Sequence, residues 1–401
     1  MGNPRSHLNV MRDVQDYIGS ALPRFTEEIL AFLRIPSVSA RSEHDEDTRC
    51  AADWLHSRLS DAGLGAEVVE TAGHPVVLGE WRGAGAEAPT VLVYGHYDVQ
   101  PPDPLKLWTS PPFEPQFREN RLYARGSADD KGQLYLHVKA AEAHLKGAGA
   151  LPVNLIILAE GEEEVGSPNL VPFVEAHKER LACDAVVISD TGMFAPGLPS
   201  LLFSLRGLAY FEIHVEGPSS DLHSGAYGGP VVNPAMALSR MLATLHDDRG
   251  RIVIDGFYDD VLDWDDETRE GIRGLPFDED EFAASLNTTL TGGEIGYSVL
   301  EKLWVRPTCE VNGLLSGYTG EGAKTVLPGK AMAKVSFRLV ADQNPQRVGE
   351  LLRSHLAAVT PEGVTVRVEE LHGGMPWRAK LDRHLKDAAT SALLKAFGAE
   401  P

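Results

Sequence analysis

The hydrophobic and polar positions of this chain follow two patterns, and the change falls near Arg206. Before that point, short apolar runs alternate with stretches whose apolar residues recur every three to four positions. The runs indicate buried strands, and the second spacing indicates amphipathic helices. The predicted strands cover residues 66–70, 76–81, 90–94, 153–159 and 184–189, and the predicted helices cover 22–33, 45–64, 130–145 and 169–180. This alternation predicts an α/β fold, with a mostly parallel sheet and helices on both faces.

After Arg206 the apolar residues recur with period two, beginning with LAYFEIHVE at 208–216. The further predicted elements are a helix at 233–245, a strand at 331–340, a helix at 345–359, a strand at 364–371 and a final helix at 381–397. A β-α-β-β-α-β order predicts an inserted α+β domain with a ferredoxin-like, antiparallel sheet. We therefore expect one domain at 1–206 and 376–401 and a second at 207–375, with the acidic stretch 259–281 as a solvated surface.

Charge and cysteine content narrow the possible partners. The chain has 37 Lys and Arg against 58 Asp and Glu, a net charge of −21, which argues against nucleic acid or an anionic membrane as the main partner. It has no stretch of about 18 apolar residues that would cross a membrane. Its three cysteines, Cys50, Cys183 and Cys309, form no zinc-type spacing and no disulfide framework, which favours a reducing cytoplasm.

Four polar clusters follow the ends of predicted strands or precede a helix, where an α/β sheet gathers its functional groups. Their members are His96 and Asp98, Asp129 and Asp130, the glutamates of LAEGEEEVGS (Glu160, Glu162, Glu163 and Glu164), and Asp190. Carboxylates this close repel one another, and a cation would relieve that repulsion. One imidazole among carboxylates suits zinc, manganese or cobalt. Taken singly, each cluster also has a plain interpretation as a helix cap, a turn or a solvated loop.

Six segments carry a family resemblance. GHYDVQP, ARGSADDKG, EGEEEVGS, ISD, DLHSGAYGG and FRLV occur in this order and extend over nearly the whole chain. Together they resemble the M20 family of metallopeptidases, in particular its cytosolic non-specific dipeptidase and carnosinase-like branch. The resemblance implies a zinc-peptidase α/β domain interrupted by a smaller lid domain that forms a homodimer. It also implies hydrolysis of dipeptides or short peptides with a free C-terminus, using two divalent metal ions per subunit, of which zinc is expected first and manganese or cobalt are alternatives.

The resemblance also implies a role for individual residues. Glu163 would be the general base, and Asp98 would orient His96. The peptide bond between Asp129 and Asp130 would be cis. Glu160 is expected to be structural or to support a metal ligand, whereas Glu162 is expected to be exposed. The implied metal ligands are His96, Asp129, Glu164 and Asp190, with Asp129 bridging the two metals.

Four residues of the second domain would contact the substrate. His223 would reach into the partner subunit's site and stabilise the tetrahedral oxyanion, although a loop histidine in a Gly-rich turn is the plain alternative. Arg338 would clamp the C-terminal carboxylate of the substrate. Asn233 would have a polar role near the site or would cap the helix that follows it. His372 matches a family position near the substrate.

The resemblance is incomplete at the C-terminal end. Family members continue beyond the equivalent of Pro401 with a Gly-Gly-Ser-type substrate loop and a histidine that completes the metal site served by Glu164. His372 and His384 do not lie in that motif, and His384 is expected to be exposed on a helix. We therefore expect a fragment of a longer product or a short paralogue. Three functions stay open: the dipeptidase, an N-acyl amino acid amidohydrolase, and a non-catalytic dimer that binds metal or peptide.

Overall fold

The computed structural model describes residues 7–379 and 382–401, and the chain forms two compact units. The first unit contains Met1–Ser200 and Thr390–Pro401, and the inserted unit contains Leu201–Ala389. Lys380 and Leu381, where the last predicted helix begins, lie outside the described residues.

The first unit is built on a five-stranded sheet with the order β1-β2-β6-β3-β7. Strand β3 runs parallel to both of its neighbours, while β2 runs antiparallel to both of its own. The three parallel strands therefore end at the same edge of the sheet. The bounds are β1 (Gly65–Val69), β2 (Val76–Trp81), β3 (Thr90–His96), β6 (Asn154–Glu160) and β7 (Ala185–Ile188).

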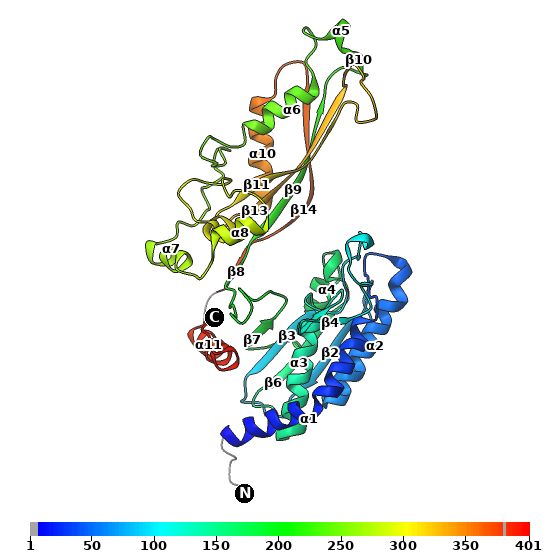
Figure 1. Ribbon diagram of the computed structural model, residues 1–401, viewed down its shortest axis with the longest axis vertical. Helices are drawn as coiled ribbons and strands as arrows, with labels where there is room; N and C mark the ends of the chain where they lie inside the picture. The colour runs from blue at the N-terminus through cyan, green and yellow to red at the C-terminus, as the bar shows by residue number, and fades with distance from the viewer. Residues whose placement is uncertain (1–6, 380–381) are drawn as a thin grey trace. The chain divides into compact units, whose positions relative to one another are not determined.

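Helices cover both faces of this sheet (Figure 1), and alternate residues of each strand point to opposite faces. Leu55 and Leu59 pack with Val93 and Ile157 on one face, and Phe173 packs with the strand residues of the other face. Each fully buried side chain of this size contributes about 1.5–3 kcal/mol. The helices are α1 (His7–Leu33), α2 (Asp45–Ala62), α3 (Lys131–Ala143) and α4 (Leu170–His177). Helix α11 (Arg383–Phe397) follows the inserted strands, and the boundary between the two units falls within it.

The first helix is longer than predicted. It begins at His7, whereas the apolar spacing predicted a start at residue 22. Pro23 lies inside the helix and removes only one backbone donor. Val14 and Ala21, on the part that was not predicted, are buried, so packing stabilises the helix through the proline.

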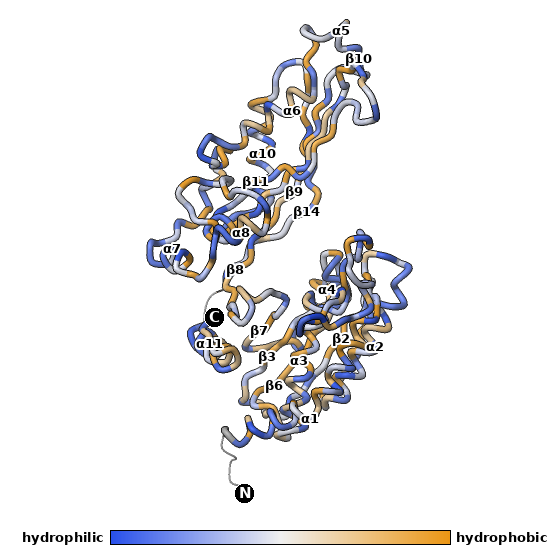
Figure 2. Tube along the Cα trace, viewed as in Figure 1, coloured by the Kyte–Doolittle hydropathy of each residue, from blue (hydrophilic) through white to orange (hydrophobic). Residues whose placement is uncertain are grey.

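The inserted unit contains a four-stranded antiparallel sheet with the order β11-β13-β9-β14. Helices α6 and α10 cover one face of it, where Phe211, Ile213 and Phe337 are buried. Its strands are coloured as alternately hydrophobic and polar in Figure 2, as a sheet with one open face requires. The bounds are β9 (Gly207–Glu216), α6 (Pro234–Ala243), β11 (Thr308–Ser316), β13 (Lys330–Leu339), α10 (Pro345–Val359) and β14 (Thr365–Gly374).

Strand β11 completes the predicted β-α-β-β-α-β order, although its residues were not predicted as a strand. A register shift between Val311 and Gly313 interrupts its alternation, which hides the period-two pattern. The α/β fold with an inserted antiparallel α+β unit is otherwise confirmed.

The acidic stretch 259–281 contains α7 (Asp266–Arg273) and the start of α8 (Glu279–Ser285), and none of its residues is buried, in agreement with the predicted solvated surface. Arg269 and Arg273 of α7 both donate to the buried carboxylate of Glu301 in α9 (Val299–Trp304). No helix among the described residues is long and apolar enough to cross a membrane. The remaining short elements are β4 (Gln116–Arg118), β5 (Arg121–Tyr123), β8 (Ser204–Leu205), β10 (Leu222–His223), α5 (Ser224–Tyr227), β12 (Val326–Leu327), β15 (Trp377–Arg378), single turns at Ser42–His44, Leu105–Leu107 and Glu163–Val165, and a π-helical turn at His144–Ala148.

Candidate metal centre

The predicted site residues of the first unit meet at the edge where β3, β6 and β7 end. His96 is the last residue of β3, Glu163 and Glu164 lie in the turn after β6, and Asp190 follows β7. Asp129 comes just before α3, which packs against β3. The parallel arrangement of the three strands thus brings together residues that are up to 94 positions apart.

Gly95 allows the start of α3 to approach β3. A Cβ atom at this position would lie 2.6 Å from Oδ2 of Asp130, which is closer than a carbon and an oxygen can approach. The same Oδ2 accepts a hydrogen bond of 3.1 Å from the backbone N–H of His96. Burial raises the pKa of Asp130 to about 7, and the nearby His96 partly offsets that effect.

His96 is fully buried, and carboxylates lie against both of its ring nitrogens. Its Nε2 is 3.1 Å from Oδ1 of Asp129 and 3.6 Å from Oδ2 of Asp190. Its Nδ1 is 3.3 Å from Oδ1 of Asp98 and 3.1 Å from the backbone oxygen of Asp98. Burial alone would lower the pKa of His96, but Asp190 and Asp98 outweigh burial and raise this pKa to about 11.

Glu163 and Glu164 are half-buried and lie beside His96. Oε2 of Glu164 accepts a hydrogen bond of 2.7 Å from Gln100, whereas its buried Oε1 has no hydrogen-bond partner among the described residues. Burial raises the pKa of Glu163 to about 7; His96 partly offsets this, and Glu164 and Asp190 raise the pKa further. A carboxylate with a pKa near neutrality can both accept and release a proton.

The donor atoms fit divalent cations. Single ligand atoms of His96, Asp129 and Asp190 lie within 4.8 Å of one another, and so do those of His96, Glu163 and Glu164. A buried carboxylate oxygen without a hydrogen-bond partner, such as Oε1 of Glu164, is free to coordinate a metal ion. The four predicted ligands therefore lie in one cluster, and the peptide bond between Asp129 and Asp130 is cis, as expected.

The other two glutamates of the cluster have structural contacts. Glu160 is buried and accepts hydrogen bonds of 2.5 Å from Tyr94 and 2.8 Å from Ser167, in agreement with the prediction. The prediction that Glu162 is exposed is wrong, because only 7% of it is exposed. Its Oε2 accepts a hydrogen bond of 2.7 Å from Asn169, and its other oxygen lies against Gly73, in the turn between β1 and β2.

Of the predicted substrate residues in the inserted unit, His223 and Asn233 make local contacts. His223 is exposed, its Nδ1 accepts a hydrogen bond of 3.1 Å from the backbone N–H of Gly225, and its Nε2 is 3.3 Å from Oγ1 of Thr325. Oδ1 of Asn233 accepts a hydrogen bond of 2.9 Å from the backbone N–H of Ala235 and caps α6, which was the alternative interpretation of this residue. Thr325 was not predicted as a site residue, because it has no motif of its own.

Arg338 and His372 lie on the open face of the inserted sheet. Arg338 pairs with Leu208 across β13 and β9, and His372 pairs with Tyr210 across β14 and β9. The rings of Tyr210 and His372 meet edge to face at 5.1 Å. Arg206 comes two residues before Leu208, the partner of Arg338, and burial together with the positive charge of Arg338 lowers the pKa of Arg206. Arg206 was not predicted as a site residue, because in the sequence it marks only the boundary between two hydrophobic patterns. His384 is exposed on α11, as expected.

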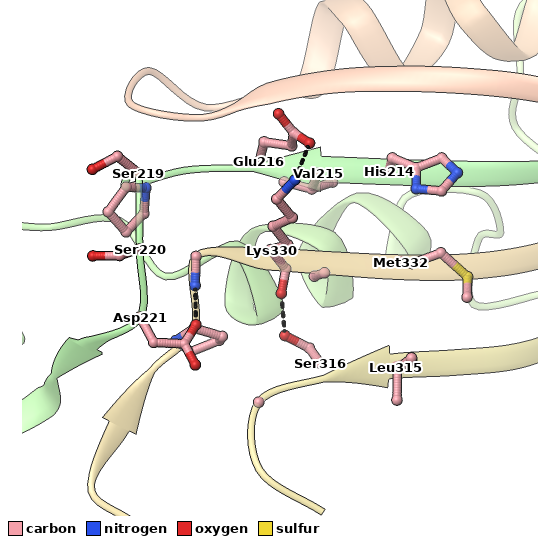
Figure 3. Close-up of a pocket in the computed structure, with 15 residues that line it drawn as sticks. His214, Val215, Glu216, Ser219, Ser220, Asp221, Leu315, Ser316, Lys330 and Met332 are labelled. Atoms are coloured by element: carbon pink, nitrogen blue, oxygen red, sulfur yellow. Dashed lines mark hydrogen bonds and ion pairs between the residues drawn. The ribbon is translucent and has the colours of Figure 1, made fainter.

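A pocket of about 480 Å³ lies at the end of the inserted sheet where β9 finishes and β13 begins, which is the end opposite to Arg338 and His372 (Figure 3). Lys330 reaches Oε1 of Glu216 at 2.9 Å, and Oδ1 of Asp221 accepts a hydrogen bond of 2.9 Å from Gly329. The charged groups that line the pocket are therefore already paired. None of the predicted site residues lines this pocket.

The family of the chain follows from comparison with known proteins. Residues 92–401 match the model of Peptidase family M20/M25/M40, and the chain belongs to this family. The predicted membership of the M20 metallopeptidases is thereby confirmed.

The relatives are named as peptidases. A Cys-Gly metallodipeptidase of Candida albicans is 34% identical over 382 residues, which cover 90% of this chain and 79% of the relative. A solved M20 family metallo-carboxypeptidase of Sulfolobus solfataricus is 36% identical with a TM-score of 0.79, covering 94% of this chain and 84% of that one. The solved dipeptidase Dug1p of Saccharomyces cerevisiae is 30% identical with a TM-score of 0.81, covering 98% and 86%.

Proposed function

We propose that this chain hydrolyses dipeptides and short peptides with a free C-terminus, with Glu163 as the general base at a centre of two divalent metal ions. The observation that carries this proposal is the pair of donor groups that share His96, one with Asp129 and Asp190 and the other with Glu163 and Glu164. The names of the relatives, a Cys-Gly metallodipeptidase and a human Beta-Ala-His dipeptidase that is 30% identical, support the substrate class.

His96, Asp129, Asp190 and Glu164 would hold the metals, and zinc suits this set of one imidazole and three carboxylates. The metals would supply Lewis acidity toward the peptide carbonyl and would acidify the attacking water. Glu163 accepts a proton from that water as its oxygen attacks the carbonyl carbon. When the C–N bond breaks, Glu163 delivers the proton to the leaving amine nitrogen. The raised pKa of Glu163 suits a group that must do both.

Arg338 would bind the free carboxylate of the substrate. Neither Arg338 nor Arg206 makes an ion pair with any carboxylate in the described ranges 7–379 and 382–401. A guanidinium group without a carboxylate partner among the described residues attracts an anion, and a bidentate contact fixes the orientation of that anion. His223 and His372 would also contact the substrate, His223 from the partner subunit. The site role expected for Asn233 has weaker support, because its side chain already caps α6.

The proposal includes a homodimer formed by the inserted unit. Strand β11 lies at the edge of its sheet and exposes three large apolar side chains, Val311, Leu314 and Leu315. An exposed apolar edge strand is a template for pairing with a second chain. A cytoplasmic location is part of the same proposal, because all three cysteines are free thiols.

The experiment replaces Glu163 with glutamine, which keeps the size of the side chain and removes its basicity. We expect Glu163→Gln to lower kcat for an Ala-X dipeptide by at least about 100-fold, since a general base contributes about 10²–10⁴-fold. Zinc content near two ions per chain, measured by elemental mass spectrometry, should be unchanged. The exposed Glu175→Gln is the matched control and should leave kcat unaltered. Equal turnover by Glu163→Gln and the wild type would exclude Glu163 as the base.

The same preparation distinguishes the alternative reactions. An N-acetyl amino acid is assayed beside the dipeptide at the same enzyme and metal concentrations. Faster cleavage of the N-acetyl substrate would replace the dipeptidase assignment with the amidohydrolase. Metal binding without turnover of either substrate would leave the non-catalytic metal-binding dimer.

A further inference from the structure

Asp98 is the side chain that joins the two halves of the candidate metal centre. It is fully buried, and its carboxylate accepts hydrogen bonds from both sides of the cluster. Oδ1 is 3.3 Å from Nδ1 of His96 and accepts the backbone N–H of Glu163 at 3.2 Å. Oδ2 accepts the backbone N–H of Glu164 at 3.1 Å. One carboxylate thus fixes both the ring of His96 and the turn that carries the two glutamates.

Oδ2 of Asp98 has one further donor. The hydroxyl of Ser39 donates to it at 2.6 Å, which is the shortest of these contacts with Asp98. A buried carboxylate needs its lone pairs satisfied, because water does not reach it. Without the Ser39 hydroxyl, Oδ2 would keep only the bond from Glu164 and would rotate to seek another donor. Such a rotation would move Oδ1 away from His96 and Glu163.

The segment that carries Ser39 is held in place by other bonds. The buried ammonium group of Lys131 donates to the backbone oxygens of Phe32 at 3.2 Å and of Ile35 at 2.7 Å. Ser37 donates its hydroxyl to the backbone oxygen of Tyr97 at 2.7 Å, and its own backbone oxygen accepts the N–H of Val99 at 2.9 Å. Replacing Ser39 therefore leaves the path of the chain intact and removes only the contact with Asp98.

We propose that Ser39 is a positioning residue that acts through Asp98 to set the geometry of both halves of the metal centre. This inference rests on the proposed metal site but not on the substrate. Groups that hold a metal ligand in place usually change metal affinity or activity by about 10–100-fold when removed. Ser39 is expected to fall in this range although it contacts neither metal nor substrate.

The test measures zinc affinity by competition with a chromophoric chelator, using zinc alone as the probe. We expect Ser39→Ala to weaken zinc binding by about 10-fold or more. Ser39→Thr, which keeps the hydroxyl, should restore at least most of that affinity. Ser37→Ala is the matched control, because the hydroxyl that it removes does not reach Asp98, while the backbone bond from Val99 and the two bonds from Lys131 still hold the segment. It should leave zinc affinity within about twofold of the wild type, the scatter expected of a group that does not support a ligand.

The outcomes separate positioning from simple destabilisation. Tm of the metal-free chain should be lowered less by Ser39→Ala than by Ser37→Ala, since Ser37 is the more deeply buried of the two. Unchanged zinc affinity in Ser39→Ala, an equal loss in Ser37→Ala, or a wild-type chain that binds no zinc would each overturn the inference. A loss confined to Ser39→Ala supports it even if no dipeptide is hydrolysed, a result that would count only against the proposed function.

Discussion

The helices α1 and α3 of the first unit are joined by buried charges, and removing one of them should destabilise the unit. The ammonium group of Lys139 lies 2.6 Å from Oε2 of Glu28 and 2.7 Å from Oε2 of Glu142. Tyr135 donates to the same oxygen of Glu28 at 2.8 Å, and Arg24 binds both carboxylates. Lys139 is 5% exposed, so water cannot replace it at these oxygens.

The expected loss in the free energy of unfolding follows from the lowered pKa of Glu28. Burial alone would raise the pKa of Glu28, but Lys139, Tyr135 and Arg24 outweigh burial and lower it to about 2. Compared with about 4.3 in an unfolded chain, this difference corresponds to about 3 kcal/mol for the whole set of partners. Breaking a buried ion pair costs about 3–5 kcal/mol when one charge stays behind unpaired. Because Arg24 remains, we expect the lower end of that range, about 3 kcal/mol, for Lys139→Met.

The assay is urea denaturation followed by tryptophan fluorescence. Trp54 reports on this core, since it stacks on Phe32 with ring centroids 4.4 Å apart. The exposed Lys146→Met is the control and should change the free energy of unfolding by less than about 0.5 kcal/mol. A loss below about 1 kcal/mol for Lys139→Met would refute the argument that these charges hold α1 on α3.

The pH dependence provides an independent check. A carboxylate whose pKa is lowered on folding stabilises the folded state at pH values above its unfolded pKa. That contribution is lost as the pH falls through its folded pKa. The difference between the wild type and Lys139→Met should therefore shrink between about pH 5 and pH 2. A difference that stays constant over this window would mean that the lost packing of Lys139, not its charge, is what matters.

Three further predictions concern the inserted unit. Glu301→Gln should lower the free energy of unfolding of the inserted unit by about 1–3 kcal/mol, because Arg269 and Arg273 lose a buried charged acceptor. Thermal unfolding measures this loss, and an unchanged unfolding transition would contradict the prediction. Arg338→Ala should raise KM for a dipeptide by at least about 10-fold, which corresponds to about 1.4 kcal/mol of binding free energy. The KM for a substrate amidated at its C-terminus should be unaffected. Equal effects on the two substrates would argue against carboxylate binding. Leu314→Asp on the edge strand β11 should convert a dimer into a 43.5 kDa species in sedimentation, and a persistent dimer would place the interface elsewhere.

The proximity of the candidate metal ligands could be predicted from the sequence because it depends on a rule of topology. Parallel strands end at one edge, so His96, Glu164 and Asp190 had to lie near one another once their strands were recognised. The buried position of Glu162 could not be predicted, since its surroundings come from Gly73, which lies in a different part of the chain. Local pattern carries no information about such a contact.

The first half of α1 and strand β11 were not predicted for the same reason. In each case tertiary packing overrides a local sequence signal against that helix or strand. Pro23 usually ends a helix, yet α1 continues through it because residues before it are buried. The bulge between Val311 and Gly313 breaks the alternation of β11, although that strand pairs along its length with β13. Arg206 and Thr325 belong to no motif. Pairing of β13 with β9 places Arg338 opposite Leu208, two residues after Arg206, and Oγ1 of Thr325 lies 3.3 Å from Nε2 of His223.

The inserted unit enters and leaves through two short paired strands. Leu205 of β8 lies opposite Trp377 of β15, and Ser204 lies opposite Arg378. The two ends of a segment of more than 170 residues are thus held side by side by its own backbone bonds. Such a segment behaves as an exchangeable module. Residues between its paired ends can be added, removed or replaced, and the two points at which the first unit connects to it stay the same distance apart. A protein engineer could graft it into another host at a two-strand junction, or replace it with a short hairpin to obtain the first unit alone.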